Sequence, residues 1–325
     1  MKVSETVVTM LTNAFSVLVF PGLLFVMIVG LLLAGIDRKV LARMQKRKGP
    51  PVLQPFYDFF KLMGKETIIP DAANRRVFLA APIIGFVSLV VMVVLIPIGG
   101  YTPFGITFNA DLIVMLYLLT IPAVALIIGG SSSGSPYAGI GISREMVTMM
   151  AYELPLVIVL LTVALKVGGG SFCFSLGEIS AWQETNGALI THWELIPAAI
   201  AFLFVIPAEV GTQPFDVAEA ETEICEGPLV EYTGAPLAMF KLNTAIKMFV
   251  MTALFTVLFF GNAVATEYLA LNALIVVAIS AGITVLSMTL AHAVCARLKI
   301  EHLFKFDWTV VTALAAISLV LVWCL

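Results

Sequence analysis

Long apolar runs separated by short polar segments dominate this sequence. A helix that crosses the hydrocarbon core of a bilayer needs about 20 residues. Eight runs are close to that length, and they lie near residues 14–36, 77–99, 111–130, 146–166, 194–209, 237–261, 270–292 and 307–325. The fifth run is the shortest. We therefore expect an all-α, polytopic integral membrane protein of about eight transmembrane helices, with residues 1–325 forming a single membrane domain.

Composition excludes a soluble globular protein. Hydrophobic residues make up 60% of the 325-residue chain and charged residues only 12%, whereas soluble domains carry about 25% charged residues. A soluble core of this size would leave much of that apolar surface in water, while a bilayer accommodates it. This composition predicts a multi-pass membrane protein, and the membrane expected for it is a prokaryotic cell membrane.

The basic residues predict the orientation of the helices. If the N-terminus lies outside, the inner side holds 16 of the 18 lysines and arginines, and the outer side holds only Lys2 and Lys166. Cytoplasmic loops carry an excess of Lys and Arg. Removing one helix from the eight would destroy this asymmetry, so the count and the orientation support each other. The predicted inner loops then span about 37–76, 131–145 and 210–236.

The first inner loop contains a predicted amphipathic helix. It opens with the basic stretch DRKVLARMQKRK, which can meet anionic lipid head groups. In the following QPFYDFFKLMGKE, Phe56, Phe59, Phe60 and Met63 fall at i, i+3, i+4 and i+7. This spacing predicts one apolar stripe on a helix that lies in the membrane surface or against a partner.

The third inner loop is rich in acids. Pro214 can start a helix and Gly227-Pro228 can end one. Between them there is no lysine or arginine, and the acids are Asp216, Glu219, Glu221, Glu223 and Glu226. On a helix, all but Glu221 share one face, where like charges repel. Crowded carboxylates cannot all ionise cheaply, so some of their pKa values rise and such groups can load and release protons. A proton or cation pathway or a partner surface is expected, with a solvated polar loop as the alternative.

Glu153 lies within the fourth apolar run, in REMVTMMAYELP. A carboxylate there costs about 2.5–3.5 kcal/mol on insertion scales and usually faces a polar interior or a pathway. Pro155 cannot donate to the Ala151 carbonyl, so we expect the helix to open or kink beside the acid. Glu145 comes eight residues earlier, about two turns, and is expected on nearly the same face. A packing acid satisfied by a neighbouring helix is the alternative.

Two residues extend this predicted pathway. Glu209 ends the fifth run and is placed to join Glu153 to the acidic loop. Lys247, inside the sixth run, either snorkels to the interface or pairs with a buried carboxylate. The candidate ion-coupling residues are Glu153, Glu209, Asp216, Glu219, Glu221, Glu223, Glu226, Arg144, Glu145 and Lys247.

Motifs for catalysis, nucleotides or metals are missing from the sequence. There is no P-loop, no GxGxxG after a strand and no nucleophile–base motif. The four cysteines form no CxxC pair, and the three histidines are scattered. The segment GGSSSGSPYAGIGISRE is expected to be a partner-docking loop or an irregular segment buried in protein. We expect no catalytic residue, cofactor, metal or nucleic-acid partner for this chain.

Three segments together resemble a known family. RKGPPVLQPFYDFFKLMGKE, SSSGSPYAGIGISREMVTMMAYELP and PFDVAEAETEICEGPLVEYTGAP are similar to motifs of the subunit 1 family of respiratory complex I. That family includes relatives in membrane-bound NiFe hydrogenases and related energy-converting complexes. The similarity runs from about residue 15 to the last helix. GPPVLQP is more compact than in quinone-reducing members, and SGSPYAGIGISREM looks more like the hydrogenase branch.

The resemblance implies an eight-helix subunit at the junction of a membrane arm and a soluble redox arm. It implies soluble hydrogenase-like large and small subunits, an iron–sulfur subunit and antiporter-like membrane subunits as partners. A NiFe centre and iron–sulfur clusters are expected in those partners and not in this chain. Asp216, Glu219, Glu221 and Glu223, with Glu153, match the start of the family's line of buried polar groups. The residues expected at the partner interface are Arg43, Lys46, Arg47, Lys48, Gln54, Ser133, Tyr137, Glu231 and Tyr232.

The leading hypothesis is therefore a membrane subunit that couples electron transfer to H⁺ or Na⁺ translocation in a hydrogenase-type or sulfur-reducing complex. A quinone-reducing complex I subunit of the same fold is the first alternative. A passive membrane anchor for the redox arm is the second. An independent secondary transporter is the third, although the sequence shows no internal repeat.

Overall fold

The structure is a computed structural model that describes residues 15–98, 109–261 and 268–324. Within these ranges, eight helical segments are long and apolar enough to cross a membrane. They are Phe15–Met44, Arg75–Leu95, Asp111–Ser132, Pro136–Gly168, Trp193–Val210, Gly234–Phe260, Leu269–Val294 and Ile300–Cys324. The predicted all-helical fold with eight spans is confirmed for the described part of the chain. Sidedness stays a prediction, and Lys2 lies outside the described residues.

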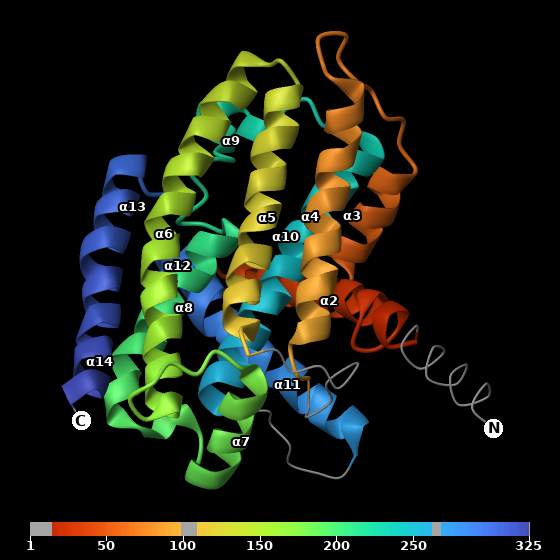
Figure 1. The fold of residues 1–325 in the computed structure, drawn as a ribbon. Coiled ribbons are helices and arrows are strands. Elements are labelled where there is room, and N and C mark those ends of the chain that lie inside the picture. The colour runs from red at the N-terminus through yellow and green to blue at the C-terminus, as the bar shows by residue number, and fades with distance from the viewer. Residues whose placement is uncertain (1–14, 99–108, 262–267, 325) are drawn as a thin grey trace.

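The individual helices are continuous in some spans and interrupted in others (Figure 1). The α-helices are α2 (Leu23–Met44), α3 (Gln54–Met63), α4 (Arg75–Leu95), α5 (Asp111–Ser132), α6 (Pro136–Gly168), α7 (Leu176–Asn186), α8 (Ile196–Val210), α9 (Glu221–Ile224), α10 (Gly234–Phe255), α11 (Leu269–Thr284), α12 (Leu290–Val294), α13 (Ile300–Phe306) and α14 (Thr312–Cys324). Single π-helical turns at Thr256–Phe260, Val285–Thr289 and Asp307–Val311 extend or join three spans. Such turns are frequent at functional sites.

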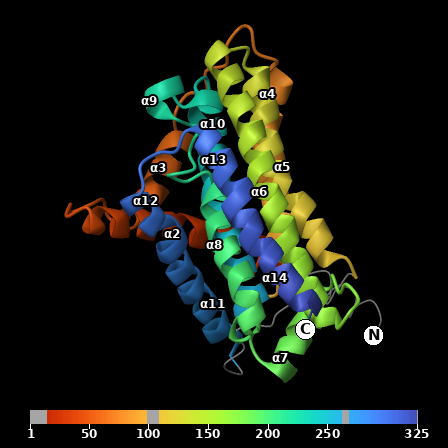
Figure 2. The ribbon, with the colours of Figure 1, turned by 90° about the vertical axis from the view of Figure 1, so that its left-hand side faces the viewer.

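α10 is the central helix of the bundle. It packs against α2, α3, α4, α8 and α11. In its span, 94% of the apolar stretch is buried, against 22% in the span that contains α14. Figure 2 shows α14 on the outside of the bundle and α2 lying across the other helices. The outer helices therefore leave apolar faces for lipid or for neighbouring subunits.

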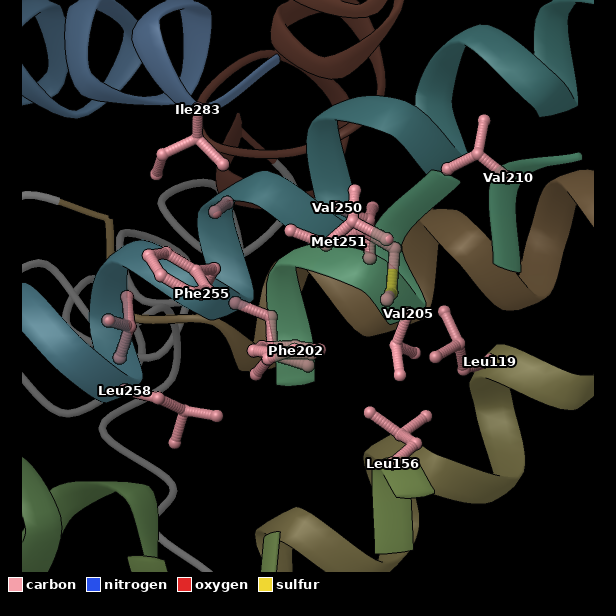
Figure 3. Close-up of a cluster of buried hydrophobic side chains, with 14 of the residues drawn as sticks. Leu119, Leu156, Phe202, Val205, Val210, Val250, Met251, Phe255, Leu258 and Ile283 are labelled. Atoms are coloured by element: carbon pink, nitrogen blue, oxygen red, sulfur yellow. The ribbon is translucent and has the colours of Figure 1, made fainter. Parts of the chain in front are cut away.

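Close packing of apolar side chains joins α8 to α10. Phe202 and Val205 on α8 meet Met251 and Phe255 on α10, and all four are buried (Figure 3). The Phe202 and Phe255 ring centroids are 5.6 Å apart. Lipid is as apolar as these side chains, so van der Waals packing, more than water exclusion, holds the two helices together.

One end of the bundle gathers the loops 45–53, 64–74, 133–135, 211–233 and 295–299, and we call it the basic end. Backbone and side-chain hydrogen bonds tie these loops to one another. Asn74 N donates to Ser132 O at 3.0 Å, and Leu298 N donates to Pro214 O at 3.1 Å. Ile68 N donates to Thr233 Oγ1 at 3.0 Å. The acidic loop is therefore part of a layer in which distant segments are joined.

α6 starts earlier than the sequence pattern predicted. The predicted span was 146–166, with an irregular segment before it, whereas the helix begins at Pro136 and has 33 residues. At 1.5 Å per residue it is about 50 Å long, more than the roughly 30 Å of a hydrocarbon core. The predicted loop over 131–145 was wrong in extent, because only residues 133–135 connect α5 to α6. Pro136 suits a first helical turn because its missing N–H has no helical partner there.

The glycine-rich start of α6 is helical, and one of its glycines, Gly141, is required by a close contact with another segment. A Cβ at Gly141 would lie 2.5 Å from Pro228 Cδ and 2.8 Å from Pro228 N. Gly141 thus lets the Gly227-Pro228 turn of the acidic loop press directly onto α6. At Gly139, two residues earlier, an added Cβ would meet nothing within 4 Å.

These two glycines give a matched pair of variants. Gly141→Ala should destabilise the assembled protein by about 1–3 kcal/mol, because the new methyl group overpacks against Pro228. Gly139→Ala should be neutral or stabilising by up to about 1 kcal/mol, since alanine is the better helix former. Denaturant unfolding of the purified complex measures both changes, and equal effects for the two alanines would contradict the packing at Pro228.

The predicted helix in the first inner loop is present as α3. Arg38 on α2 holds it through an ion pair with Asp58, at 3.0 Å. The predicted single apolar stripe is divided: Phe56 and Phe59 pack toward the bundle, whereas Phe60 is 68% exposed. Tyr57 and Met63 are exposed as well. α3 therefore presents a second apolar face to lipid or to a partner.

Candidate functional site

A small polar cavity lies at the basic end, where α5, α6, α8 and α10 meet under the acidic loop. Its volume is about 60 Å³, enough for several water molecules at about 10–15 Å³ each. Five charged side chains line it, namely Glu145, Glu209, Asp216, Glu219 and Lys247. All five are among the predicted ion-coupling residues, and they come from α6, α8, the acidic loop and α10. We call this space the acidic cavity.

The most enclosed charges of the acidic cavity form an ion pair between α8 and α10. Lys247 Nζ lies 2.7 Å from Glu209 Oε1, and the side chains are 8% and 2% exposed. Of the two expectations for Lys247, the structure shows the buried pair and not snorkelling. Removing one partner of such a pair is strongly destabilising, because the other charge stays buried.

Tyr152 is a part of the site that sequence reasoning missed. Lys247 Nζ lies 5.9 Å from the centroid of the Tyr152 ring, a cation–π distance. The Tyr152 hydroxyl is buried and has no hydrogen-bond partner among the residues that the structure describes. Tyr152 follows Glu145 by seven residues, which at 3.6 residues per turn leaves them about 20° apart. That near-repeat is the signal in the sequence that would have identified Tyr152.

Glu153 lies beside the acidic cavity and not on its wall. Eight residues after Glu145, it is turned about 80° away, since eight residues exceed two full turns. It is not among the residues that line the cavity. Glu153 is half-buried, and its carboxylate is near enough to Glu209 and Lys247 to interact with both charges. The prediction that Glu145 and Glu153 share a helix face is therefore wrong. Both carboxylates are nevertheless near the charges of Glu209 and Lys247.

The acidic loop does not form a helix from Pro214 to Gly227, although these residues could start and end one. Only the single turn of α9 is helical, followed by a 3₁₀ turn at Gly227–Leu229. Cys225 and Glu226 have positive φ angles of 53° and 70°, which end the helix. The four acids consequently do not share one face. Asp216 and Glu219 turn into the cavity, whereas Glu223 is exposed. The side chain of Glu221 lies outside what the structure describes.

Glu219 titrates in an unusual range. Burial, with the neighbouring carboxylates of Asp216, Glu145 and Glu226, raises the pKa of Glu219 to about 8, against the weaker opposing effect of Lys241. Ionised Glu219 would lie in a partly desolvated cavity beside other anions, which favours its protonated form. Near neutral pH this carboxyl group can therefore accept or release a proton in response to a small change in nearby charge.

Two arginines hold the acidic loop to the bundle. Arg144, in the third turn of α6, has its Nη1 atom 2.6 Å from Glu223 Oε2, and it also donates to the Val217 carbonyl at 3.3 Å. Arg297, before α13, lies 2.8 Å from Asp216 Oδ2. Sequence reasoning included Arg144 and missed Arg297, which is 81 residues from Asp216. Acids in this loop thus have charge partners although none occurs within the loop itself.

The residues expected at the partner interface are partly exposed and partly internal. Arg43, Lys46, Arg47, Lys48 and Tyr137 are exposed on the basic end, and Gln54 and Glu231 are half-buried. Ser133 is buried, with its hydroxyl donating to Gly130 O. Tyr232 is also buried, stacked on Phe78 at 3.9 Å between ring centroids. Ser133 and Tyr232 therefore stabilise this chain itself and offer no side-chain surface to a partner.

An apolar layer separates the acidic cavity from the opposite end of the bundle. Along α6, the buried residues after Tyr152 include Leu156, Val159 and Val163. Beyond them, Lys166 Nζ lies 2.5 Å from Glu194 Oε1 near α7. Thr162, within the layer, donates its hydroxyl to the Ile158 carbonyl of its own helix. Along α6, buried apolar side chains therefore lie between the acidic cavity and the Lys166–Glu194 pair.

Comparisons with known proteins give a consistent family. A family model described as NADH dehydrogenase matches residues 16–323. An NADH-quinone oxidoreductase subunit from Bordetella petrii is 31% identical over 236 residues, which cover 70% of this chain and 66% of that protein's length. NADH-ubiquinone oxidoreductase chain 1 of Chondrus crispus is 37% identical over 235 residues, covering 70% and 69%.

A solved structure matches over nearly its full length. It is described as the membrane-bound sulfane sulfur reductase (MBS), an archaeal respiratory membrane complex. The superposition has a TM-score of 0.85 with 30% sequence identity, and it covers 97% of this chain and 99% of the matched chain. The curated relatives are thus named as quinone oxidoreductase subunits, whereas the matched structure is named as a sulfur reductase.

Proposed function

Because the chain belongs to the NADH dehydrogenase family, as a member of its subunit 1 group, we propose that it links a soluble redox module to an ion-translocating membrane arm. The complex is of the hydrogenase-related or sulfur-reducing type, and electron transfer in it drives H⁺ or Na⁺ translocation. The full-length similarity to a chain of the sulfane sulfur reductase supports this type. A NiFe-type large subunit, a small subunit, an iron–sulfur subunit and antiporter-like subunits are the proposed partners.

The observation that carries the proposal is the acidic cavity under the loop that reaches the basic end. A charge change in a docked redox partner acts first on the exposed loop, through Glu223 and its ion pair with Arg144. Asp216 and Glu219, in the same loop, line the cavity. A change in the loop therefore alters the charge around the Glu209–Lys247 pair. The protonation state of the cavity carboxylates in this way couples the partner-docking surface to the buried ion pair.

The apolar layer beyond Tyr152 determines where the ion goes next. Leu156, Val159 and Val163 close the route along α6 toward the α7 end. The outer helices of the bundle are poorly buried within the chain, so they are available to neighbouring membrane subunits. We propose that the ion or its charge effect passes sideways to such a subunit. This chain then supplies the coupling step and not a complete channel.

Replacing one cavity carboxylate tests the proposal. In vesicles that contain the intact complex, Glu145→Gln should strongly reduce redox-driven ion uptake while electron transfer to an artificial acceptor continues. The expected reduction in ions moved per electron is about 5- to 150-fold, the usual size of a coupling between sites. Glu153→Gln should have a smaller effect, because Glu153 is beside the cavity. Glu184→Gln, at an exposed position of α7, should have none. Unchanged uptake in Glu145→Gln would leave only the role of a passive anchor.

A quinone-reducing subunit is the second candidate, favoured by the names of the curated relatives at 31–37% identity. The subunits that co-purify with this chain discriminate the two. A large subunit with metal-binding cysteines indicates a hydrogenase, and one without them indicates sulfur or quinone chemistry. Reduction of polysulfide but not of a short-chain quinone by the purified complex supports the first candidate over the second.

A further inference from the structure

Asp307 is a buried carboxyl group that the acidic cavity does not include. It opens the π-helical turn Asp307–Val311, which joins α13 to α14 within one membrane span. The residue is 1% exposed, and its Oδ2 atom is buried with no hydrogen-bond partner in the part of the chain that the structure describes. Among the described residues, no lysine, arginine or histidine forms an ion pair with it. Without such partners, the neutral carboxylic acid is the stable form in this apolar place.

Stability alone does not account for Asp307. A well-packed apolar side chain at the same position would avoid the desolvation of a polar group. The π turn does not need the acid either, because the Asp307 carbonyl already accepts a hydrogen bond from Thr312 Oγ1 at 2.8 Å. Ionisable residues inside a membrane span are rare and usually functional.

Aromatic contacts connect this turn to the wall of the acidic cavity. Phe306, the residue before Asp307, has its ring centroid 6.4 Å from that of Phe215. Phe215 lines the cavity beside Asp216. The turn packs against α6 and α8, the helices that carry Glu145 and Glu209. On its other side, the Trp308 indole reaches the Met150 carbonyl of α6 at 3.5 Å.

We propose that Asp307 is a proton-binding site that exchanges its proton with the acidic cavity past the Phe215–Phe306 contact. It extends the pathway of the proposed function, on which this inference rests, to the seam between α6 and α14. The charged and titratable groups on the elements packed against the turn are Tyr137, Arg144, Glu145, Tyr152, Glu153 and Lys166 on α6, Glu209 on α8, Glu301, His302 and Lys305 on α13, and Cys324 on α14. α14 lies at the outside of the bundle (Figure 2), where a neighbouring subunit can receive the proton.

Chemical labelling tests whether the acid is protonated. Dicyclohexylcarbodiimide is an apolar reagent that adds to protonated carboxyl groups in membranes. Applied to the intact complex at neutral pH and followed by peptide mass mapping, it should modify Asp307. Asp58, which is ion-paired with Arg38 at the surface, should stay unmodified and serves as the control. An unmodified Asp307 under conditions that modify other membrane carboxyl groups overturns the proposal.

Two substitutions test whether that proton is used. Asp307→Asn keeps the shape but carries no exchangeable acid, and it should lower ions moved per electron at least about fivefold with electron transfer unchanged. Asp307→Glu restores an acid and should recover part of that uptake, which a merely structural role does not predict. Normal uptake in an assembled Asp307→Asn complex overturns the inference while leaving the proposed function intact. If Asp307→Asn fails to assemble, the assembled Asp307→Glu complex decides: absence of uptake there overturns the inference.

A different experimental outcome would contradict the proposed function itself. A wild-type complex that moves no ions during electron transfer removes both ideas before any Asp307 variant is compared. Loss of uptake in Glu145→Gln together with normal uptake in Asp307→Asn removes only Asp307 from the pathway.

Discussion

Lys247→Met should destabilise the assembled complex by about 3–5 kcal/mol, because it leaves the Glu209 carboxylate buried without its cation. Lys247 Nζ is 2.7 Å from Glu209 Oε1, and neither side chain is open to solvent. Methionine fills a similar volume, so loss of charge dominates over loss of packing. Denaturant unfolding of the purified complex, followed by a signal specific to this chain, measures the change.

The double variant Lys247→Met/Glu209→Gln separates charge from shape. It removes both ions and should recover most of the lost stability, since replacing a buried pair entirely is often nearly neutral. Lys65→Met is the control: Lys65 is exposed and makes no ion pair among the described residues, so its change should stay within about 0.5 kcal/mol. If Lys247→Met alone is as stable as the wild type, Glu209 is not a buried carboxylate that depends on Lys247 as its partner, and the structural interpretation is contradicted.

Glu219→Gln should remove a pH dependence of stability that the wild-type protein shows between about pH 4.5 and pH 8. The pKa of Glu219 rises from its ordinary 4.5 to about 8 in the folded protein. Between these values the folded state holds a proton that the unfolded state has lost. Stability therefore falls as pH rises, by up to about 1.4 kcal/mol per pH unit, and the contribution is fully present only below about pH 4.5.

Unfolding measured from pH 6 to pH 9 in both proteins checks this sign. The wild type should lose more stability than Glu219→Gln on going from pH 6 to pH 8, with little further difference above pH 9. Glu184→Gln, an exposed carboxyl on α7, should follow the wild-type profile. A wild-type profile identical to that of Glu219→Gln would contradict a protonated Glu219 at neutral pH.

The spans could be predicted from the sequence because length and hydropathy decide membrane insertion. Each apolar run became a helix, and α3 formed where the apolar spacing indicated it. The start of α6 could not be predicted in the same way. Gly139 and Gly141 are poor helix formers, and only the contact of Gly141 with Pro228, 87 residues later, explains the second of them.

The acids of the site could be identified, but their pairing could not. Lys247 had several candidate partners, and the choice of Glu209 depends on how α8 packs against α10. Pro214 and Gly227-Pro228 could start and end a helix in the acidic loop. Tertiary contacts from Arg144 and Arg297 instead hold it in an irregular form that turns two acids inward.

Asp307 shows why the limits of a span matter. With the last span predicted to begin at residue 307, an acid there would be an ordinary interfacial residue. The helical span begins at Ile300, which puts Asp307 seven residues, or about 10 Å, inside it at 1.5 Å per residue. The segment IEHLFKFD contains four charged or titratable side chains, and this polarity concealed the start of the helix.

The ratio of ions translocated to electrons transferred, measured for the Lys247→Met/Glu209→Gln complex in sealed vesicles, tests the role of the acidic cavity most directly. The double variant restores stability, so a changed ratio reports coupling and not assembly. We expect electron transfer at the wild-type rate with ion uptake reduced to background. A wild-type ratio in this variant would contradict the central claim that the charges around the cavity carry the coupling.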